Sequence, residues 1–216
     1  MIKENRITTL IFDLGNCLVD FDHKIAANRI KEFTDKSIEE IFNLFFDSGI
    51  TGIFEEGKIS PEGFFLEVKA LLNAKITYEQ FLPIWNEIFV LSQKNKDLYI
   101  LAKALKKDYK LAVLSNINIL HFEYIEKNFS ILDVFDNVIT SYQLRVRKPQ
   151  VEIYRKTLEI LNTPAECAFY TDDRPELIKA ASQLGIKAFV FVGVEQLKKD
   201  LLKSGINISL ISSYAY

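Results

Sequence analysis

The sequence predicts an α/β protein in which helices cover both faces of a mostly parallel, doubly wound sheet. Short apolar runs, rich in β-branched and aromatic residues, alternate with longer stretches of helical periodicity. Near-continuous apolar runs are typical of strands buried on both faces, and their alternation with helices indicates the α/β class. Strands are expected at residues 7–12, 110–115, 137–140, 167–171 and 187–192.

A long helical insertion separates the first two expected strands. Residues 13–109 lie between them, whereas a crossover between parallel strands needs only about a dozen residues. Within this stretch apolar residues recur at three- and four-residue steps, as in Ile38, Ile41 and Phe45. The segments SIEE and SPEG are helix-start signals. We therefore expect a helical cap inserted into the sheet domain.

The boundaries of the two parts follow from the same pattern. The cap is expected at residues 18–92, and a helix at 94–107 then returns the chain to the sheet. The core accordingly comprises residues 1–17 and 93–216. The aromatic side chains of the insertion, Trp85 among them, are expected to form the hydrophobic core of the cap rather than a ligand site.

Composition and charge exclude several classes of protein. The 216 residues are 49% hydrophobic and 26% charged, as in globular domains, and the net charge of −2 predicts neither a nucleic-acid nor a membrane partner. The apolar stretch after Lys3 and Arg6 is too short for a signal peptide, and no run reaches transmembrane length. Cys17 and Cys167 lie far apart, which favours a reduced, cytoplasmic setting. We expect a monomer or a homodimer.

Polar side chains follow four of the five expected strands, at or just beyond the point where each strand ends. In chain order they are Asp13, Ser115 with Asn116, Lys148, and Asp172 with Asp173. Each has an ordinary structural explanation, such as a helix cap or a loop charge. In open parallel sheets, however, ligands bind outside the carboxyl ends of the strands. We therefore expect these side chains to share one crevice.

The chemistry of this set points to phosphoryl transfer. Three converging carboxylates would repel one another unless a cation were present. Mg²⁺ prefers oxygen ligands and uses one or two carboxylates together with waters and phosphate oxygens. The Lys148 ammonium and the Ser115 hydroxyl remain as donors to an anion. A carboxylate nucleophile, a metal and such donors are the parts of a phosphoryl-transfer site.

Four ordered segments resemble the motifs of the haloacid dehalogenase superfamily, in particular its phosphatases with a helical cap after the first motif. They are LIFDLGNCLVD, LAVLSN, RVRKP and FYTDDRPELIKAASQLG. The resemblance covers essentially the whole chain, and it implies a Rossmann-like core. This chain shares FDLGN and a downstream RKP with one subgroup of the superfamily. That subgroup resembles small sugar-phosphate phosphatases, including glucose-1-phosphate phosphatases.

The resemblance also implies a role for each motif residue. Asp13 is the nucleophile that becomes an aspartyl phosphate, and Lys148 stabilises the phosphoryl group and the nucleophile. The substrate phosphate is bound by Ser115, Asn116 and Asn16. Mg²⁺ is held by Asp13, by the backbone carbonyl of Gly15 and by Asp173, with Asp172 as a further metal-site residue. The expected partner is a small phosphorylated metabolite.

Three positions depart from the superfamily pattern. Most of its phosphatases carry a second aspartate two residues after the nucleophile, as general acid and base, and here that position is Gly15. Leu177 stands where the superfamily often has Asp or Asn. Arg145 stands where even the similar subgroup often has glycine.

The glycine at position 15 raises the question of what protonates the leaving group. General acid–base catalysis contributes about 10²–10⁴-fold, so its loss should slow such an enzyme without abolishing turnover. An anomeric leaving group or an acid elsewhere would offset the loss. Asp20 and Asp22 are candidates for that acid, although their positions also fit surface acids flanking a helix. We expect His23 at a partly exposed helix start and His121 on the surface.

Two other functions stay open at this point. A 2-haloacid dehalogenase also lacks the second aspartate and needs no metal, but the paired Asp172 and Asp173 suit a metal. Alternatively, the chain keeps the fold as a binding or regulatory module with weak or no turnover, which Gly15 and Leu177 would favour. Phosphate release with and without Mg²⁺ separates the three.

Overall fold

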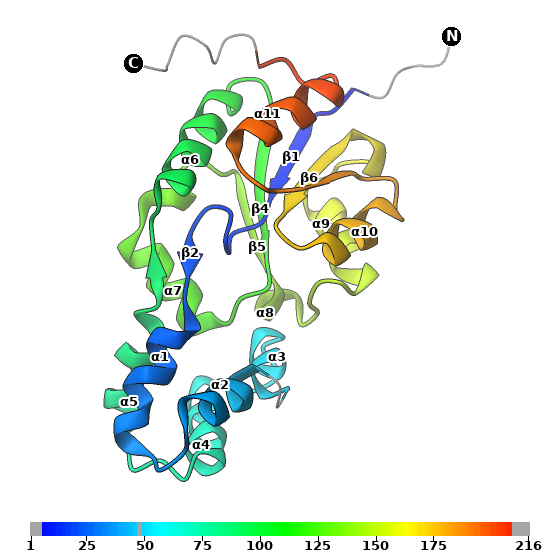
Figure 1. Ribbon diagram of the computed structural model, residues 1–216. Coiled ribbons are helices and arrows are strands. Elements are labelled where there is room, and N and C mark those ends of the chain that lie inside the picture. The colour runs from blue at the N-terminus through cyan, green and yellow to red at the C-terminus, as the bar shows by residue number, and fades with distance from the viewer. Residues whose placement is uncertain (1–5, 47–48, 209–216) are drawn as a thin grey trace.

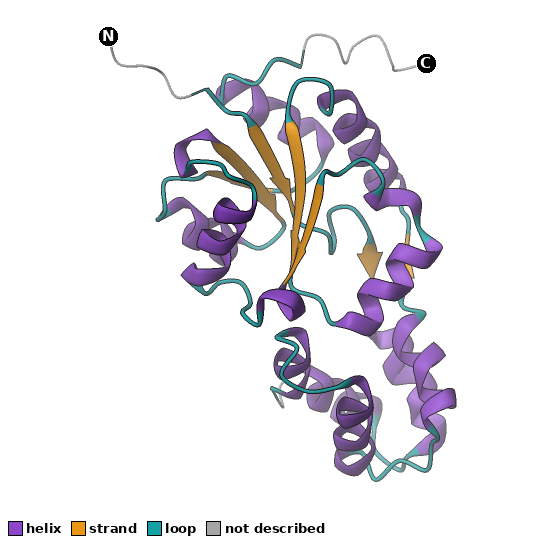
Figure 2. Cartoon of the chain, turned by 180° about the vertical axis from the view of Figure 1, so that it is seen from behind, coloured by secondary structure: helices purple, strands orange, loops and turns teal. Residues whose placement is uncertain are grey.

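A five-stranded parallel sheet forms the centre of the computed structural model, which describes residues 6–46 and 49–208 (Figures 1 and 2). Its strands lie in the order β5-β4-β1-β6-β7. They are β1 (Thr9–Phe12), β4 (Lys110–Ser115), β5 (Asn137–Thr140), β6 (Ala168–Asp172) and β7 (Lys187–Val190). The chain moves outward from β1 to β5 and then returns beside β1 to begin β6. The predicted doubly wound, Rossmann-like sheet is confirmed, with its switch point next to β1.

The helices of the sheet domain cover both faces of the sheet. They are α6 (Gln93–Leu105), α7 (Ile119–Asn128), α8 (Ser141–Leu144), α9 (Val151–Ile160), α10 (Pro175–Ser182) and α11 (Val194–Lys203). Alternate residues of β1 separate the two faces. Leu10 and Phe12 pack with α6, α7 and α11, whereas Ile11 packs with α9 and α10. All four residues of β1 are buried, which explains why the strands appear as apolar runs without alternation.

The inserted helices gather at the end of the sheet toward which the strand arrowheads point (Figures 1 and 2). They are α1 (His23–Ile30), α2 (Ile38–Phe46), α3 (Ile50–Glu55), α4 (Pro61–Leu71) and α5 (Tyr78–Asn86). Both expected start signals form caps: the Ser60 hydroxyl accepts from the amide of Gly63, and Ser37 and Glu40 bond reciprocally.

Helices α1–α5 pack around a hydrophobic core of their own, separate from the two that flank the sheet. Trp85 is 1% exposed there, and its ring stacks on Phe81, so its predicted place in the cap core is confirmed. The helices and this third core are consistent with the expected inserted cap. The boundaries at 17/18 and 92/93 stay a prediction.

A short antiparallel pair, which no sequence pattern indicated, joins the insertion to the sheet domain. Strand β2 (Asp20–Phe21) pairs with β3 (Phe89–Val90). Two-residue strands are too short to show any periodicity, so their pairing depends on the fold that brings them together. The pair places Phe21 close to the end of β1.

No helix in the described ranges combines the length and apolar character needed to cross a membrane.

Candidate active site

The predicted site residues gather where β1, β4 and β6 end. Asp13 directly follows β1, and its amide donates to the carbonyl of Thr171 in β6 at 2.9 Å. Lys148 lies beyond β5 in the loop before α9, and its ammonium is 2.6 Å from Asp13 Oδ1. The parallel register thus brings together residues more than a hundred positions apart, as the strand ends predicted.

Lys148 is the centre of a buried charged cluster. The residue is 1% exposed, and its Nζ lies 2.6 Å from Asp13 Oδ1 and 2.6 Å from Asp172 Oδ2. It also donates to the carbonyl of Leu114 at 3.0 Å. Burial acts against the ammonium charge, but the two carboxylates outweigh it and raise the pKa of Lys148 above its ordinary value. The side chain is therefore a fixed cation beside Asp13.

The Asp13 carboxyl group experiences opposing influences. Burial raises its pKa to about 7, the neighbouring Lys148 opposes that shift, and Asp172 adds to it. A further cation bound at this point would favour the ionised form of Asp13. The cluster therefore has an excess of carboxylate that suits a divalent ion.

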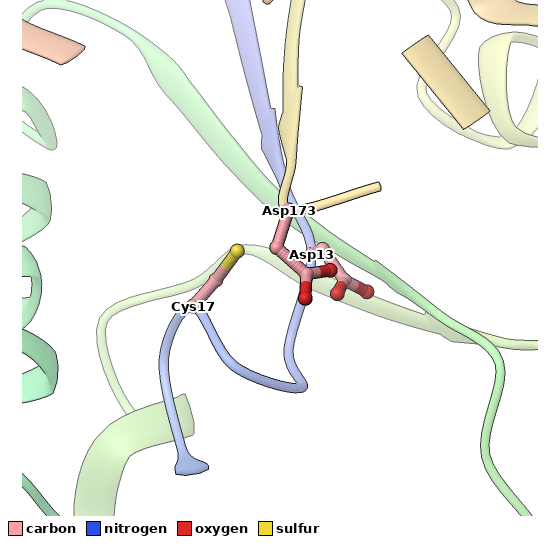
Figure 3. Close-up of side chains that lie close together, drawn as sticks. All are labelled: Asp13, Cys17 and Asp173. Atoms are coloured by element: carbon pink, nitrogen blue, oxygen red, sulfur yellow. The ribbon is translucent and has the colours of Figure 1, made fainter. Parts of the chain in front are cut away.

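Asp13 and Asp173 are the two carboxylates that fit a hard metal ion. Their oxygens and the sulfur of Cys17 all lie within 4.8 Å of one another (Figure 3). Asp173 Oδ2 accepts from Asn16 Nδ2 at 3.1 Å, which orients the carboxylate. Burial raises the pKa of the Cys17 thiol well above its ordinary value, so its chemistry does not suit Mg²⁺. The donor set of two carboxylates fits Mg²⁺.

Asp172 and Asn116 both hold Lys148, although Asn116 also lines the cavity over Asp13. Asp172 is fully buried; Oδ2 accepts from Lys148 and from the hydroxyl of Tyr170, and Oδ1 accepts from the amide of Arg174. Asn116 makes two hydrogen bonds to the backbone of Lys148, at 2.8 and 2.9 Å. Asp172 is thus a poor metal ligand, because both its oxygens are already engaged.

A cavity of about 130 Å³ lies over Asp13. Its lining includes the predicted residues Asp13, Gly15, Asn16, Ser115, Asn116, Lys148 and Asp173. It also includes Phe21, Glu55, Arg147, Arg174 and Leu177. No role was predicted from the sequence for Glu55, Arg147 or Arg174. We call this space the phosphate cavity, because its cations and hydroxyl suit an anion.

A second cavity, of about 60 Å³, adjoins the first. It is lined mainly by apolar and aromatic side chains from the core and from the β2–β3 pair, including Leu14, Val19, Phe21, Phe89, Ile117 and Ile125. His23 and His121 also line it, together with Gly15, Glu55, Ser115 and Asn116. We call it the aromatic cavity. It is small and mostly apolar, in contrast to the phosphate cavity.

Phe21 occupies the space that a side chain at position 15 would need. A Cβ added to Gly15 would lie 2.7 Å from Cε1 of Phe21, closer than such atoms approach. The φ angle of Gly15 is not in the positive region, so the ring and not the backbone excludes a larger residue. The position of the Phe21 ring therefore depends on a glycine at position 15.

Arg145 departs from the superfamily pattern for a different reason. Its φ is +55°, a conformation that glycine adopts readily.

The other polar residues near the cap entrance have structural roles. Asp20 pairs with Lys94 at 2.8 Å, and Asp22 caps α1 by accepting from the amide of Lys24. Neither lines the two cavities, so the structure does not support them as the missing acid. His23 starts α1 and is partly exposed, as expected.

His121 is buried, and the expectation of a surface position was wrong. The residue is 5% exposed because Trp85 of the cap stacks on its ring, with 4.7 Å between ring centroids. Nε2 lies 3.0 Å from the carbonyl of Trp85, and Nδ1 lies 3.1 Å from Nδ2 of Asn118. A carbonyl only accepts and this amide nitrogen only donates, so the ring is neutral with its proton on Nε2.

Known proteins that are similar to this chain include haloacid dehalogenase-like hydrolases. The family profile described as haloacid dehalogenase-like hydrolase matches residues 10–192. The chain belongs to this family. It is 26% identical to D-ribitol-5-phosphate phosphatase of Bacteroides thetaiotaomicron over 189 residues, which are 85% of this chain and 91% of that enzyme. The predicted resemblance to haloacid dehalogenase phosphatases is confirmed.

Solved structures of haloacid dehalogenase family enzymes share the whole fold. One from Bacteroides thetaiotaomicron has a TM-score of 0.79 and 26% identity, over 90% of this chain and 98% of the other. A wild-type complex of that enzyme with magnesium and inorganic phosphate has a TM-score of 0.75 and 26% identity, over 95% and 98% of the two chains. That relative binds both ions that the site chemistry suggests.

Proposed function

We propose that this haloacid dehalogenase-like hydrolase is a Mg²⁺-dependent phosphatase that acts on a small phosphorylated metabolite, a sugar or polyol phosphate. The observation that carries the proposal is the buried Lys148 bridging Asp13 and Asp172 beside a second cavity-lining carboxylate, Asp173. Similarity to a ribitol-phosphate phosphatase and to an enzyme that binds magnesium and phosphate supports it.

The residues divide the chemistry in a simple way. Asp13 attacks phosphorus, and the ester P–O bond breaks as an aspartyl phosphate forms. Lys148 and the Ser115 hydroxyl balance charge on the phosphoryl oxygens, and Arg147 and Arg174 extend the positive lining of the same cavity. Water then attacks the phosphorus of the aspartyl phosphate, which releases inorganic phosphate and regenerates Asp13.

Asp13 and Asp173 would hold the metal, with the Gly15 carbonyl as a third protein ligand. When bound, Mg²⁺ neutralises charge between the nucleophile and the phosphate. Asn16 fixes Asp173 through its amide, and Asn116 and Asp172 fix Lys148. In this assignment Asn16 and Asn116 position other site residues, and Ser115 contacts the phosphate.

The proposal is tested by phosphate release from a panel of sugar, polyol and aryl phosphates, with Mg²⁺ and with chelator. We expect turnover only with Mg²⁺, and its recovery when excess Mg²⁺ is restored. Asp13→Asn should abolish turnover with the fold intact, because a neutral amide cannot form the acyl phosphate. Asp108→Asn, at an exposed position on the surface of the sheet domain, is the matched control and should behave like the wild type. Metal-independent hydrolysis, or none by the wild type, would contradict the proposal.

A further inference from the structure

The boundary between the two cavities marks where the scissile bond of a phosphate ester would lie. With the phosphoryl group in the phosphate cavity next to Asp13, the leaving group extends into the aromatic cavity. Five described residues line both cavities: Gly15, Phe21, Glu55, Ser115 and Asn116. Of these five, Glu55 alone has an ionisable side chain. This step rests on the proposed function, because it assumes that a phosphate ester is the substrate.

Glu55 is held at this boundary by contacts between the cap and the core. It is the last residue of α3, and its carbonyl accepts a hydrogen bond from the Ser141 hydroxyl at 2.6 Å. Its carboxylate is 3.5 Å from Nη2 of Arg147. Gly52 lets Arg147 pack closely against α3, because a Cβ there would lie 2.1 Å from Nη1 of Arg147 and the guanidinium would have to move. A cap residue is thus fixed against the core site.

The next turn of chain packs equally closely on the core. A Cβ at Gly57 would lie 2.4 Å from the carbonyl oxygen of Tyr142, so glycine lets the two backbones approach. The Glu55 side chain keeps 21% of its surface exposed, and it lines both cavities. Its carboxyl group therefore has access to the space where the leaving-group oxygen would lie.

The surroundings of Glu55 favour retention of a proton. Burial raises the pKa of Glu55 above its ordinary value; Arg147, Arg174 and Lys148 oppose this shift, and Glu56 adds to it. This direction is the one required of a carboxylic acid that donates a proton near neutral pH.

The other titratable groups in the aromatic cavity cannot supply that proton. Burial lowers the pKa of His23 to about 4 and that of His121 to about 3, so both rings are neutral near pH 7. The His121 proton on Nε2 is also directed to the carbonyl of Trp85.

We propose that Glu55 protonates the leaving group, the task that the family aspartate performs where this chain has Gly15. In the first step the Glu55 carboxylic acid gives its proton to the ester oxygen as the P–O bond breaks and the bond from Asp13 to phosphorus forms. In the second step the Glu55 carboxylate takes a proton from the attacking water, whose oxygen bonds to phosphorus while the aspartyl bond breaks. Each turnover thus consumes one water and restores both carboxyl groups.

The test is the dependence of kcat/KM on leaving-group pKa, measured for a series of alkyl and aryl phosphates with Glu55→Gln. Poor leaving groups need the proton, so kcat/KM for alkyl phosphates should fall about 10²–10⁴-fold in Glu55→Gln. Aryl phosphates with acidic phenols should change little, and the plot should become steeper. Glu55→Asp keeps the acid on a shorter side chain and should recover part of the activity toward alkyl phosphates.

Glu56→Gln is the matched control on the adjacent residue. Glu56 pairs with Lys58 at 2.6 Å and accepts from Gln150, outside both cavities, so its replacement should leave the slope unchanged. An equal loss for all esters in Glu55→Gln, or an unchanged slope, would overturn the proton-donor role. That result differs from failure of the proposed function, in which the wild type itself releases no phosphate from any ester with Mg²⁺.

Discussion

The two adjoining cavities are built in different ways. The phosphate cavity is formed around the buried cluster of Lys148 with Asp13 and Asp172, and most of its lining comes from loops after the strands of one parallel sheet. The aromatic cavity is completed by Phe21, Phe89 and His23, which come from the β2–β3 pair and the first cap helix. Topology determines the first, and the packing of the cap determines the second.

This difference separates two tasks in one site. The charged groups of the phosphate cavity are held by hydrogen bonds and ion pairs to the backbone and to other side chains, so they are in place before a substrate binds. The aromatic cavity consists mainly of ring and aliphatic contacts, whose shape changes with each residue. We therefore expect substrate choice to depend on the cap, and the chemistry to depend on the core together with Glu55 of α3.

The largest effect is expected when the charged cluster is broken by Lys148→Met. Removing the ammonium leaves Asp13 and Asp172 buried without their cation, which costs about 3–5 kcal/mol of the free energy of unfolding, and turnover should also be lost. Urea unfolding followed by circular dichroism measures the change.

Lys156→Met is the control for that prediction. Lys156 pairs with Glu152 on one helix at 3.2 Å, and both side chains are at least partly exposed, so its loss should change stability by only about 0.3–0.5 kcal/mol. Similar midpoints and slopes for both variants would show that the buried cluster does not stabilise the core.

A smaller effect is expected where the two cavities meet, at Gly15. In Gly15→Asp the new Cβ meets the ring of Phe21, and this overpacking should cost about 1–3 kcal/mol. In a Phe21→Ala background the same substitution should cost less, because the space is then free. A double-mutant cycle from urea unfolding gives this coupling energy, and purely additive effects would contradict the steric account.

The sheet and the charged side of the site were predictable from sequence because they depend on local pattern and strand order. Leu10, Ile11 and Phe12 form an apolar run, and the polar residue that follows a parallel strand must lie at the edge shared with the other strand ends. This rule places Asp13 at that edge, whereas Lys148 reaches it from the loop between α8 and α9. Asp172 lies in the same cluster, but its hydrogen bonds to Tyr170 and Arg174 have no sequence signal.

The cap side was not predictable in the same way. Glu55 is one acid among several in an insertion of helices, and only the contacts of α3 with Ser141 and Arg147 place it in the site. His121 is buried because Trp85, 36 positions earlier, stacks on it. Neither contact follows from periodicity, since each depends on how two separately packed units meet.

The burial of His121 at that contact should make the stability of the protein depend on pH. The neutral His121 ring has a pKa of about 3 in the fold, against 6.5 ordinarily, because burial disfavours its charged form. Below pH 6.5 the unfolded chain therefore binds a proton that the folded chain does not bind, so the free energy of unfolding decreases as the pH is lowered. This contribution is present in full above pH 6.5 and should decrease by about 1.4 kcal/mol per pH unit below it.

His121→Gln should remove this one-proton contribution while keeping an N–H that can donate to the carbonyl of Trp85. The variant is expected to be less stable than the wild type at pH 7, but its loss of stability between pH 6 and pH 4.5 should be shallower by about 1.4 kcal/mol per pH unit. Asp13 and Glu55, whose pKa values are raised in the fold, act in the opposite direction in both proteins, and His23 acts in the same direction in both. The difference between the two urea-unfolding series therefore isolates His121. Parallel curves would contradict this account, because they would show that His121 binds protons equally in the folded and unfolded states.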